Sequence, residues 1–129
     1  LTNIGAAPYS VTKHAAVALA EWLAVTYGSR GIHVSALCPQ FVRTPMIDDF
    51  ATMTGAGPDL ATWVHTIAID PKDVAQAVID AIHDERFLVL PHPEVLEYFR
   101  SKATDYDRWI AGMQKLQASL LDDDSQAGR

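Results

Sequence analysis

The sequence of 129 residues contains very little cysteine, and Cys38 is the only one. A single thiol excludes an intramolecular disulfide framework and a zinc site built from several thiolates. The five histidines also lack the close spacing of metal ligands, so the sequence predicts no metal site. This cysteine usage is typical of a reducing compartment, and we expect a cytoplasmic protein.

Basic residues and long apolar runs are scarce as well. Lysine and arginine number 10 against 16 aspartates and glutamates, which gives a formal net charge of -6. Because the chain has no basic run, its composition argues against nucleic acid and against an anionic membrane surface as partners. No apolar run is long enough to span a bilayer, and no signal-peptide pattern opens the chain.

The residues that are present follow the alternation of an α/β domain. An alanine-rich helix is predicted over Tyr9–Tyr27, with Gly28 at its end. The short apolar runs Ile32–Leu37 and Phe87–Leu90 each predict a buried strand. Asp70, followed by a proline, predicts the capped start of a helix between these strands. Helices and strands in this order predict a parallel sheet.

The other segments predict additional helices. A short helix is expected within residues 60–69, after a glycine-broken stretch that is either a lid over a pocket or an ordinary surface excursion. Two further helices are predicted at about 93–102 and 105–121. We expect one domain over residues 1–121, followed by a mobile acidic tail over residues 122–129.

The best candidate for chemistry is the pair Tyr9 and Lys13, at the start of the first helix. Residues four apart on a helix share a face, and an ammonium ion beside a phenol stabilises the phenolate. A phenol in that environment can exchange a proton with an alcohol near neutral pH. The alternative is two solvent-facing residues, because Tyr98 and Lys102 have the same spacing without other chemistry around them. Spacing alone leaves both interpretations open.

A second candidate is the loop that follows the first predicted strand. Cys38 and Pro39 end that strand, and residues 40–45 leave its carboxyl end. In open parallel sheets, ligands bind outside the carboxyl ends of the strands. The loop is therefore expected to contact a ligand.

In this order, the chain from Tyr9 to Leu90 resembles the C-terminal half of a short-chain dehydrogenase/reductase. The segments that carry the resemblance are Tyr9-x-x-x-Lys13, Gly31 to Val34, Pro39 with Thr44, and Asp70 to Ala75. The resemblance implies the C-terminal half of a Rossmann-type doubly wound parallel sheet, with extra C-terminal helices. It also implies an enzyme that transfers a hydride between an alcohol or carbonyl substrate and NAD or NADP.

The resemblance also implies roles for individual residues. Tyr9 would donate a proton to the carbonyl oxygen or take one from the alcohol. Lys13 would assist it and bind the ribose hydroxyls of the cofactor. Pro39, Val42 and Thr44 would lie beside the nicotinamide, with backbone groups of Val42 and the hydroxyl of Thr44 at its carboxamide.

The substrate side is expected from position in the sequence. Phe41, Met46 and Met53 are candidates for lining it. Gln40 stands where the family usually has glycine, and its side-chain amide is a further candidate contact to cofactor or substrate. A glycine at that position permits positive φ, which Gln40 disfavours, so the departure bears directly on how the nicotinamide would bind.

The family's glycine-rich phosphate-binding turn and its catalytic serine and asparagine have no counterpart in this chain. The expectation is therefore a C-terminal portion, starting just after the serine position, that is inactive alone. The family's helix equivalent to Tyr9–Tyr27 usually packs against a symmetry mate, so a homodimer or homotetramer is expected. The alternative function is a non-catalytic fragment or relative that serves as an oligomerisation module.

Overall fold

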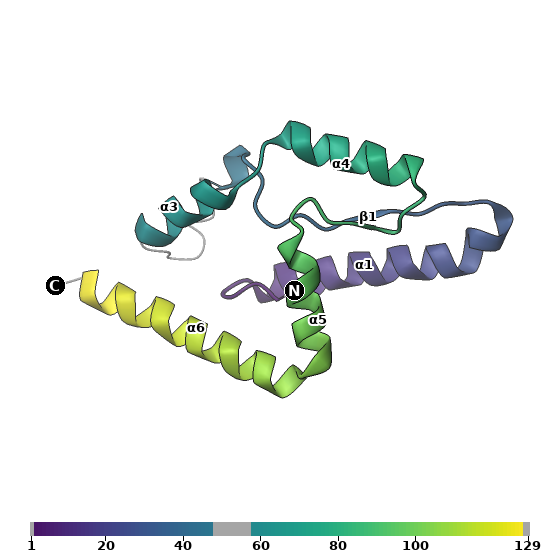
Figure 1. Ribbon diagram of the computed structural model, residues 1–129. Helices are drawn as coiled ribbons and strands as arrows, with labels where there is room; N and C mark the ends of the chain where they lie inside the picture. The colour runs from purple at the N-terminus through teal and green to yellow at the C-terminus, as the bar shows by residue number, and fades with distance from the viewer. Residues whose placement is uncertain (1, 48–57, 128–129) are drawn as a thin grey trace.

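The computed structural model describes residues 2–47 and 58–127 of the chain (Figure 1). Its elements, in chain order, are α1 (Ala7–Tyr27), η1 (Gly28–Arg30), β1 (Ala36–Leu37), α3 (Pro58–Ile67), α4 (Pro71–His83), β2 (Leu88–Val89), α5 (Glu94–Thr104) and α6 (Tyr106–Ala127). The alternation of helices and strands predicted from the sequence is confirmed within these ranges.

The sheet of the described residues has two parallel strands. Ala36 of β1 lies opposite Leu88 of β2, and Leu37 lies opposite Val89. The Cys38 N–H donates to the Val89 carbonyl at 3.0 Å, which continues the ladder beyond β1. Both strands are shorter than predicted, because a strand is defined by backbone hydrogen bonds to its neighbour. Ser35 reaches the segment before β2 through its side chain, whose hydroxyl donates to the Arg86 carbonyl at 2.8 Å.

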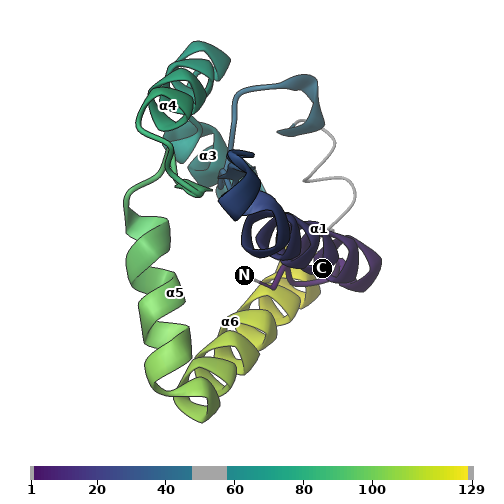
Figure 2. The same ribbon diagram turned by 90° about the vertical axis from the view of Figure 1, so that its right-hand side faces the viewer.

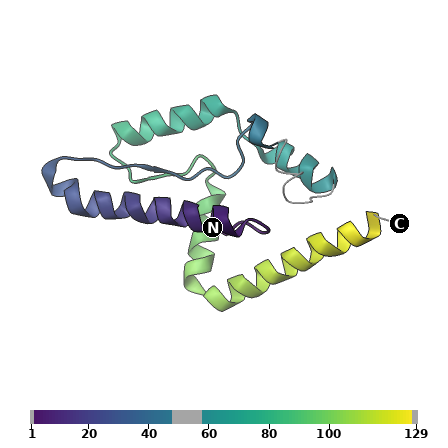
Figure 3. The same cartoon turned by 180° about the vertical axis from the view of Figure 1, so that it is seen from behind.

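Helices cover both faces of this small sheet. Figures 1 and 2 show α4 on one face of the strand pair and α1 on the other. The chain leaves β2 through α5, and α6 then runs back from the far end of α5 (Figure 3). A parallel pair covered on both faces is the layering of α/β proteins.

Local signals explain how α1 begins and ends. Pro8 stands in its first turn, where a missing N–H costs no helical hydrogen bond. The Ser10 hydroxyl accepts from the Asn3 N–H at 2.9 Å and holds the preceding loop against the helix. Gly28 caps the helix with right-handed geometry, and the left-handed residue that turns the chain toward β1 is Gly31, with a φ of 78°.

The start of α4 confirms the predicted cap. The Asp70 carboxylate accepts from the Lys72 N–H at 2.9 Å, and Pro71 occupies the first turn. Val74 and Ala81 of α4 are buried against the rest of the fold. This helix is therefore anchored on the sheet by its own apolar face.

The remainder of the core is small. Ile47, Val64 and Ala68 form a buried cluster, with Phe41 packed against it. In contrast, α1 has no buried residue along its 21 residues. Apolar side chains of α1 are thus left for another surface to cover.

The C-terminal helix is longer than predicted. The sequence placed its end near residue 121, whereas α6 continues to Ala127. The segment expected to be a mobile acidic tail is therefore helical through Ala127. The domain boundary at residue 121 stays a prediction. Within the described ranges, no helix has both the length and the hydropathy that crossing a membrane requires.

Candidate active site

Tyr9 and Lys13 meet at the start of α1. The Lys13 ammonium lies 5.3 Å from the centre of the Tyr9 ring. Tyr9 is 49% exposed, and its hydroxyl has no hydrogen-bond partner among the described residues. The pair therefore combines a cation with an accessible phenol whose oxygen is free to meet a ligand.

The second pair with the same spacing is arranged differently. The Lys102 ammonium lies 5.0 Å from the Tyr106 ring centre and 4.7 Å from that of Trp109. These two rings belong to α6, so Lys102 joins α5 to α6 through cation–π contacts. Its partner in the spacing, Tyr98, is 46% exposed. Lys102 has a packing role, and the structure separates the two pairs that spacing alone left equivalent.

Two polar side chains near Tyr9 form hydrogen bonds with backbone carbonyls of α1. The Thr12 hydroxyl contacts the carbonyls of Pro8 and Tyr9, each at 3.0 Å. His14 Nδ1 lies 2.7 Å from the Ser10 carbonyl. These side chains hold the first turns of α1 together, and none of them contacts the Tyr9 hydroxyl.

The loop after β1 is fastened to the segment before α4. The Ile69 N–H donates to the Phe41 carbonyl at 3.1 Å, and the Arg43 N–H donates to the Ile69 carbonyl at 2.9 Å. These bonds form a parallel bridge between Val42 and Ile69. Because they use the residues on either side of Val42, its own N–H and C=O point away from Ile69. Neither of these two groups has a hydrogen bond in the part of the chain that the structure describes.

Two further predicted cofactor residues lie in the same loop. Thr44 is exposed, and its carbonyl accepts from the Ile47 N–H at 2.9 Å. The Thr44 hydroxyl has no partner among the described residues. Pro39 is exposed where the chain leaves β1. At the carboxyl end of the sheet, the loop thus presents the Thr44 hydroxyl and the backbone N–H and C=O of Val42.

The residues expected on the substrate side fall into different environments. Phe41 packs into the buried cluster, with its ring 6.1 Å from that of Trp63 in a T-shaped arrangement. Met46 is 69% exposed. Met53 lies outside the described residues. Phe41 therefore anchors the loop. Of the two candidates that the structure describes, Met46 is the one whose side chain is largely exposed.

Gln40 contacts a residue that sequence reasoning missed. Its backbone N–H donates to Nδ1 of His92 at 3.2 Å. His92 lies just after β2 and is only 3% exposed. The signal that could have revealed it is its place at the end of a predicted strand, because the carboxyl ends of parallel strands lie at one edge of a sheet. Gln40 also has no positive φ, so this chain needs no glycine there.

The two parts of the candidate site lie at the same end of the fold. Figures 1 and 3 show the start of α1 and the end of β1 on the same side of the molecule. No hydrogen bond or ring contact among the described residues joins Tyr9 or Lys13 to the loop over 39–44. The candidate site therefore consists of two separate groups of residues at one end of the fold.

Cys38 does not have the features of a nucleophile. Burial raises the pKa of its thiol from the ordinary value of 9.0, so the thiol stays protonated at neutral pH. Within the described ranges, no three His, Cys, Asp or Glu residues gather as metal ligands.

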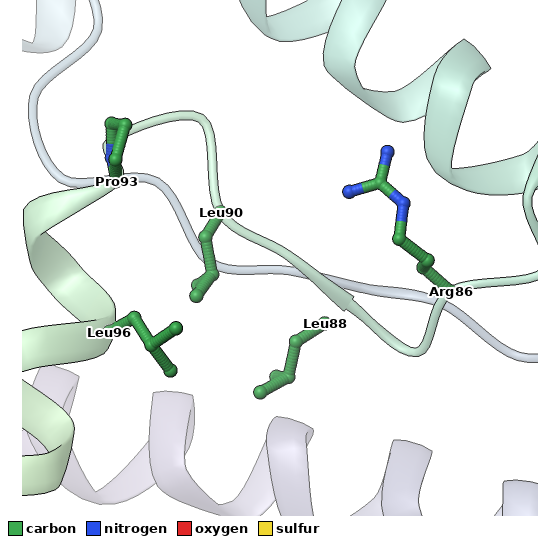
Figure 4. A pocket seen from close by; sticks show the side chains of 5 residues that line it. All are labelled: Arg86, Leu88, Leu90, Pro93 and Leu96. Atoms are coloured by element: carbon green, nitrogen blue, oxygen red, sulfur yellow. The ribbon is translucent and has the colours of Figure 1, made fainter.

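Two cavities lie outside these groups. A groove of about 910 Å³ runs between the loop before α1 and the aromatic face of α6, with Val11 and Trp109 among its lining residues. A smaller apolar cavity of about 350 Å³ is shown in Figure 4. There Leu88 and Leu96 point toward α1, whereas Arg86 points to the other side of the strand. The residues that line this cavity come from β2, from the residues that flank it and from the start of α5.

The chain is similar to several curated proteins. The 1-deoxy-11-beta-hydroxypentalenate dehydrogenase of Streptomyces exfoliatus is 31% identical over 111 residues, which cover 86% of this chain and 38% of that protein. Oxidoreductase UcpA of Escherichia coli (strain K12) is 34% identical over 113 residues, covering 87% and 37%. The short-chain dehydrogenase anuF of Penicillium roqueforti (strain FM164) is 35% identical over 77 residues, covering 56% and 27%.

This chain spans less than two fifths of the length of these relatives. No solved structure gave a significant match. A family model described as Enoyl-(Acyl carrier protein) reductase matches residues 2–88, a range that contains Tyr9, Lys13 and the loop after β1. From this match and these relatives, the chain belongs to the short-chain dehydrogenase/reductase family.

Proposed function

We propose that the intact protein is an NAD(P)-dependent oxidoreductase that interconverts an alcohol and a carbonyl, with Tyr9 as the proton donor and acceptor. The observation that carries the proposal is the Lys13 ammonium beside the half-exposed Tyr9, whose hydroxyl has no partner among the described residues. This arrangement occurs in a chain of a family whose relatives are named dehydrogenases and oxidoreductases.

The proton transfer rests on two sources of positive potential. Lys13 supplies a full charge one turn from Tyr9. The N-terminus of α1 supplies a partial one, because Tyr9 is the third residue of that helix. Both place positive potential at the end of α1 where the phenol lies. Tyr9 can then give its proton to a carbonyl oxygen during reduction, or take one from a hydroxyl during oxidation.

The loop after β1 fits the nicotinamide end of NAD or NADP. When bound, that cofactor supplies or accepts the hydride. The free N–H and C=O of Val42 match the donor and acceptor of a primary carboxamide, and the Thr44 hydroxyl adds a further polar contact. Pro39 would flank the ring, and Lys13 would contact the ribose hydroxyls. The helices on both faces of the sheet fit the C-terminal half of a doubly wound Rossmann-type fold.

The substrate is proposed to be a small molecule that carries an alcohol or carbonyl group. Met46 offers an exposed apolar side chain next to the proposed cofactor loop. Gln40 and Phe41 belong to the same loop, and Met53 is assigned to this side from its position in the sequence. Of these, the two methionines would contact the apolar part of the substrate.

The helix α1 is proposed as the contact between subunits. Leu19, Trp22 and Val25 are 57%, 55% and 80% exposed, and α1 has no buried residue. Apolar side chains gathered on one helix mark an interaction surface. A second copy of the chain would cover them in a homodimer or homotetramer. The same observation supports the alternative function, a non-catalytic oligomerisation module.

Nicotinamide chemistry in the intact protein separates these two functions. The experiment incubates the protein with a panel of primary and secondary alcohols and either NAD⁺ or NADP⁺, and follows the reduced nicotinamide. Calorimetry measures binding of each nucleotide in parallel. The proposal predicts binding and turnover with at least one pair. If the protein forms an oligomer that binds neither nucleotide, the oxidoreductase function is contradicted and the non-catalytic oligomerisation module is favoured.

A further inference from the structure

The buried imidazole of His92 joins the loops that follow the two strands. His92 lies between two prolines just after β2 and is 3% exposed. Among the residues with described side chains, it is the one buried polar or charged residue. Its Nδ1 accepts a hydrogen bond from the Gln40 N–H at 3.2 Å, across 52 positions in the sequence. The contact therefore ties the proposed cofactor loop to the loop after β2.

The hydrogen bond determines which ring nitrogen carries the proton. The Gln40 N–H is a donor, so Nδ1 of the neutral imidazole must be the acceptor and Nε2 carries the proton. This Nε2 is buried without a partner in the described part of the chain. The Gln40 side-chain oxygen Oε1 is also buried and unpartnered there. The contact thus leaves one unpaired donor on His92, Nε2, and one unpaired acceptor on Gln40, Oε1.

A buried imidazole in this position has one polar function that the described residues show, which is to hold the Gln40 N–H. Unpaired buried polar groups are rare because each one destabilises the folded state. An apolar residue at position 92 would therefore avoid the free-energy cost of burying Nε2 without a partner. Such a residue would also remove the acceptor for Gln40. The bond lies two residues before Val42, whose backbone groups must keep one orientation to meet a carboxamide.

We propose that His92 is a positioning residue, which holds the loop over Gln40–Thr44 in its cofactor-binding geometry through the Gln40 N–H. The inference rests on the proposed function, because the loop is assigned there to the nicotinamide end of the cofactor. In this proposal His92 is assigned no contact with substrate or cofactor. It acts from the loop after β2, and the bridge between Val42 and Ile69 fixes the loop on its other side.

The test uses variants of the intact protein that differ in where an acceptor lies. In His92→Asn, the side-chain oxygen takes the place of Nδ1, whereas in His92→Gln the amide reaches the place of Nε2. His92→Leu removes both polar atoms. His83→Leu is the matched control, because the His83 side chain is 88% exposed at the end of α4.

The first readout is hydrogen exchange of the segment containing Gln40–Thr44, measured without nucleotide. We expect faster exchange in His92→Leu and His92→Gln, and protection close to the unchanged protein in His92→Asn and His83→Leu. Unchanged protection in His92→Gln would overturn the positioning role. This comparison also stands if His92→Leu fails to fold, because both amide variants keep a polar side chain of similar size.

The second readout is the dissociation constant of the nucleotide that the unchanged protein binds. We expect His92→Gln to weaken binding about tenfold, which corresponds to about 1.4 kcal/mol, and His92→Asn to restore it. A lower melting temperature with an unchanged dissociation constant would overturn the positioning role and leave the proposed function intact. Absence of nucleotide binding in the unchanged protein would overturn both.

Discussion

At the scale of residues, the contact made by each lysine distinguishes two identical spacings. Tyr9 with Lys13 and Tyr98 with Lys102 both place a tyrosine and a lysine one helical turn apart. Lys13 lies at the ring of its own tyrosine, whereas Lys102 turns to the rings of Tyr106 and Trp109. Which aromatic ring a lysine reaches depends on the neighbouring helix, so spacing could not distinguish the two pairs. The assignment of Tyr9 as a site residue stays a prediction that rests on the family context.

Replacing each lysine by methionine in the intact protein is expected to have different effects on kcat/KM and on stability. Lys13→Met should lower kcat/KM by at least about tenfold, because one charge interaction of about 1.4 kcal/mol is lost. Lys102→Met should leave kcat/KM unchanged and lower the stability by about 0.5–1 kcal/mol through the lost cation–π contacts. Steady-state kinetics and thermal melting check both. Equal kinetic losses in the two variants would contradict the assignment of Lys13.

Cys38 is expected to react slowly with alkylating reagents in the folded protein. Burial raises the pKa of the Cys38 thiol, so the reactive thiolate is scarce at neutral pH and increases only as the pH rises through the raised pKa. Ionisation costs more in the folded state, so the stability due to this group is present below the ordinary pKa of 9.0 and is lost above it. The check is the rate of iodoacetamide labelling against pH, with and without denaturant. Equal rates in both states at neutral pH would contradict burial of the thiol.

At the scale of elements, local signals were predictive and partner-dependent features were not. The cap of α4 was predictable because Asp70 and Pro71 act on their own helix. The lengths of β1 and β2 were wrong because a strand is defined by its hydrogen-bonded neighbour. His92 was missed for the same reason, since its partner Gln40 is distant in the sequence.

Two glycines at the end of α1 give a matched test of the turn into β1. Gly31 has a φ of 78°, whereas Gly28 has a φ of −56°. No atom lies within 4 Å of an added Cβ at either position, so the backbone angle is the difference between them. Gly31→Ala should destabilise the intact protein by about 1–2 kcal/mol. Gly28→Ala should stabilise it by about 0.4–1 kcal/mol. Thermal melting measures both, and shifts of the same sign and size would contradict the turn geometry.

At the scale of the whole molecule, the described fold leaves much apolar surface to be covered. Its buried cluster is small, and the apolar side chains of α1 are all at least partly exposed. The order of helices and strands was predictable because hydrophobic periodicity and turn residues indicate where each element lies. The Rossmann-type sheet stays a prediction. The arrangement of subunits stays a prediction that rests on the family, because periodicity shows which face is apolar and not what covers it.

A carboxylate placed on α1 tests whether that helix joins subunits. Val25 is 80% exposed, so Val25→Glu is tolerated in a single subunit but would be buried and unpaired in an interface. We expect this variant of the intact protein to shift toward the monomer in sedimentation velocity. The control is Ile79→Glu on α4, at a residue 58% exposed, which should keep the oligomer. An unchanged oligomer in Val25→Glu would exclude α1 as the contact.

The central claim is that Tyr9 handles the proton, and Tyr9→Phe in the intact protein tests it most directly. The measurement is kcat, with the nucleotide dissociation constant determined on the same sample and Tyr98→Phe as the matched control. Removing a general acid and base costs about 100-fold or more, so we expect kcat to fall by that factor while nucleotide binding stays close to normal. Tyr98→Phe should keep full turnover. Near-normal kcat in Tyr9→Phe would contradict the account.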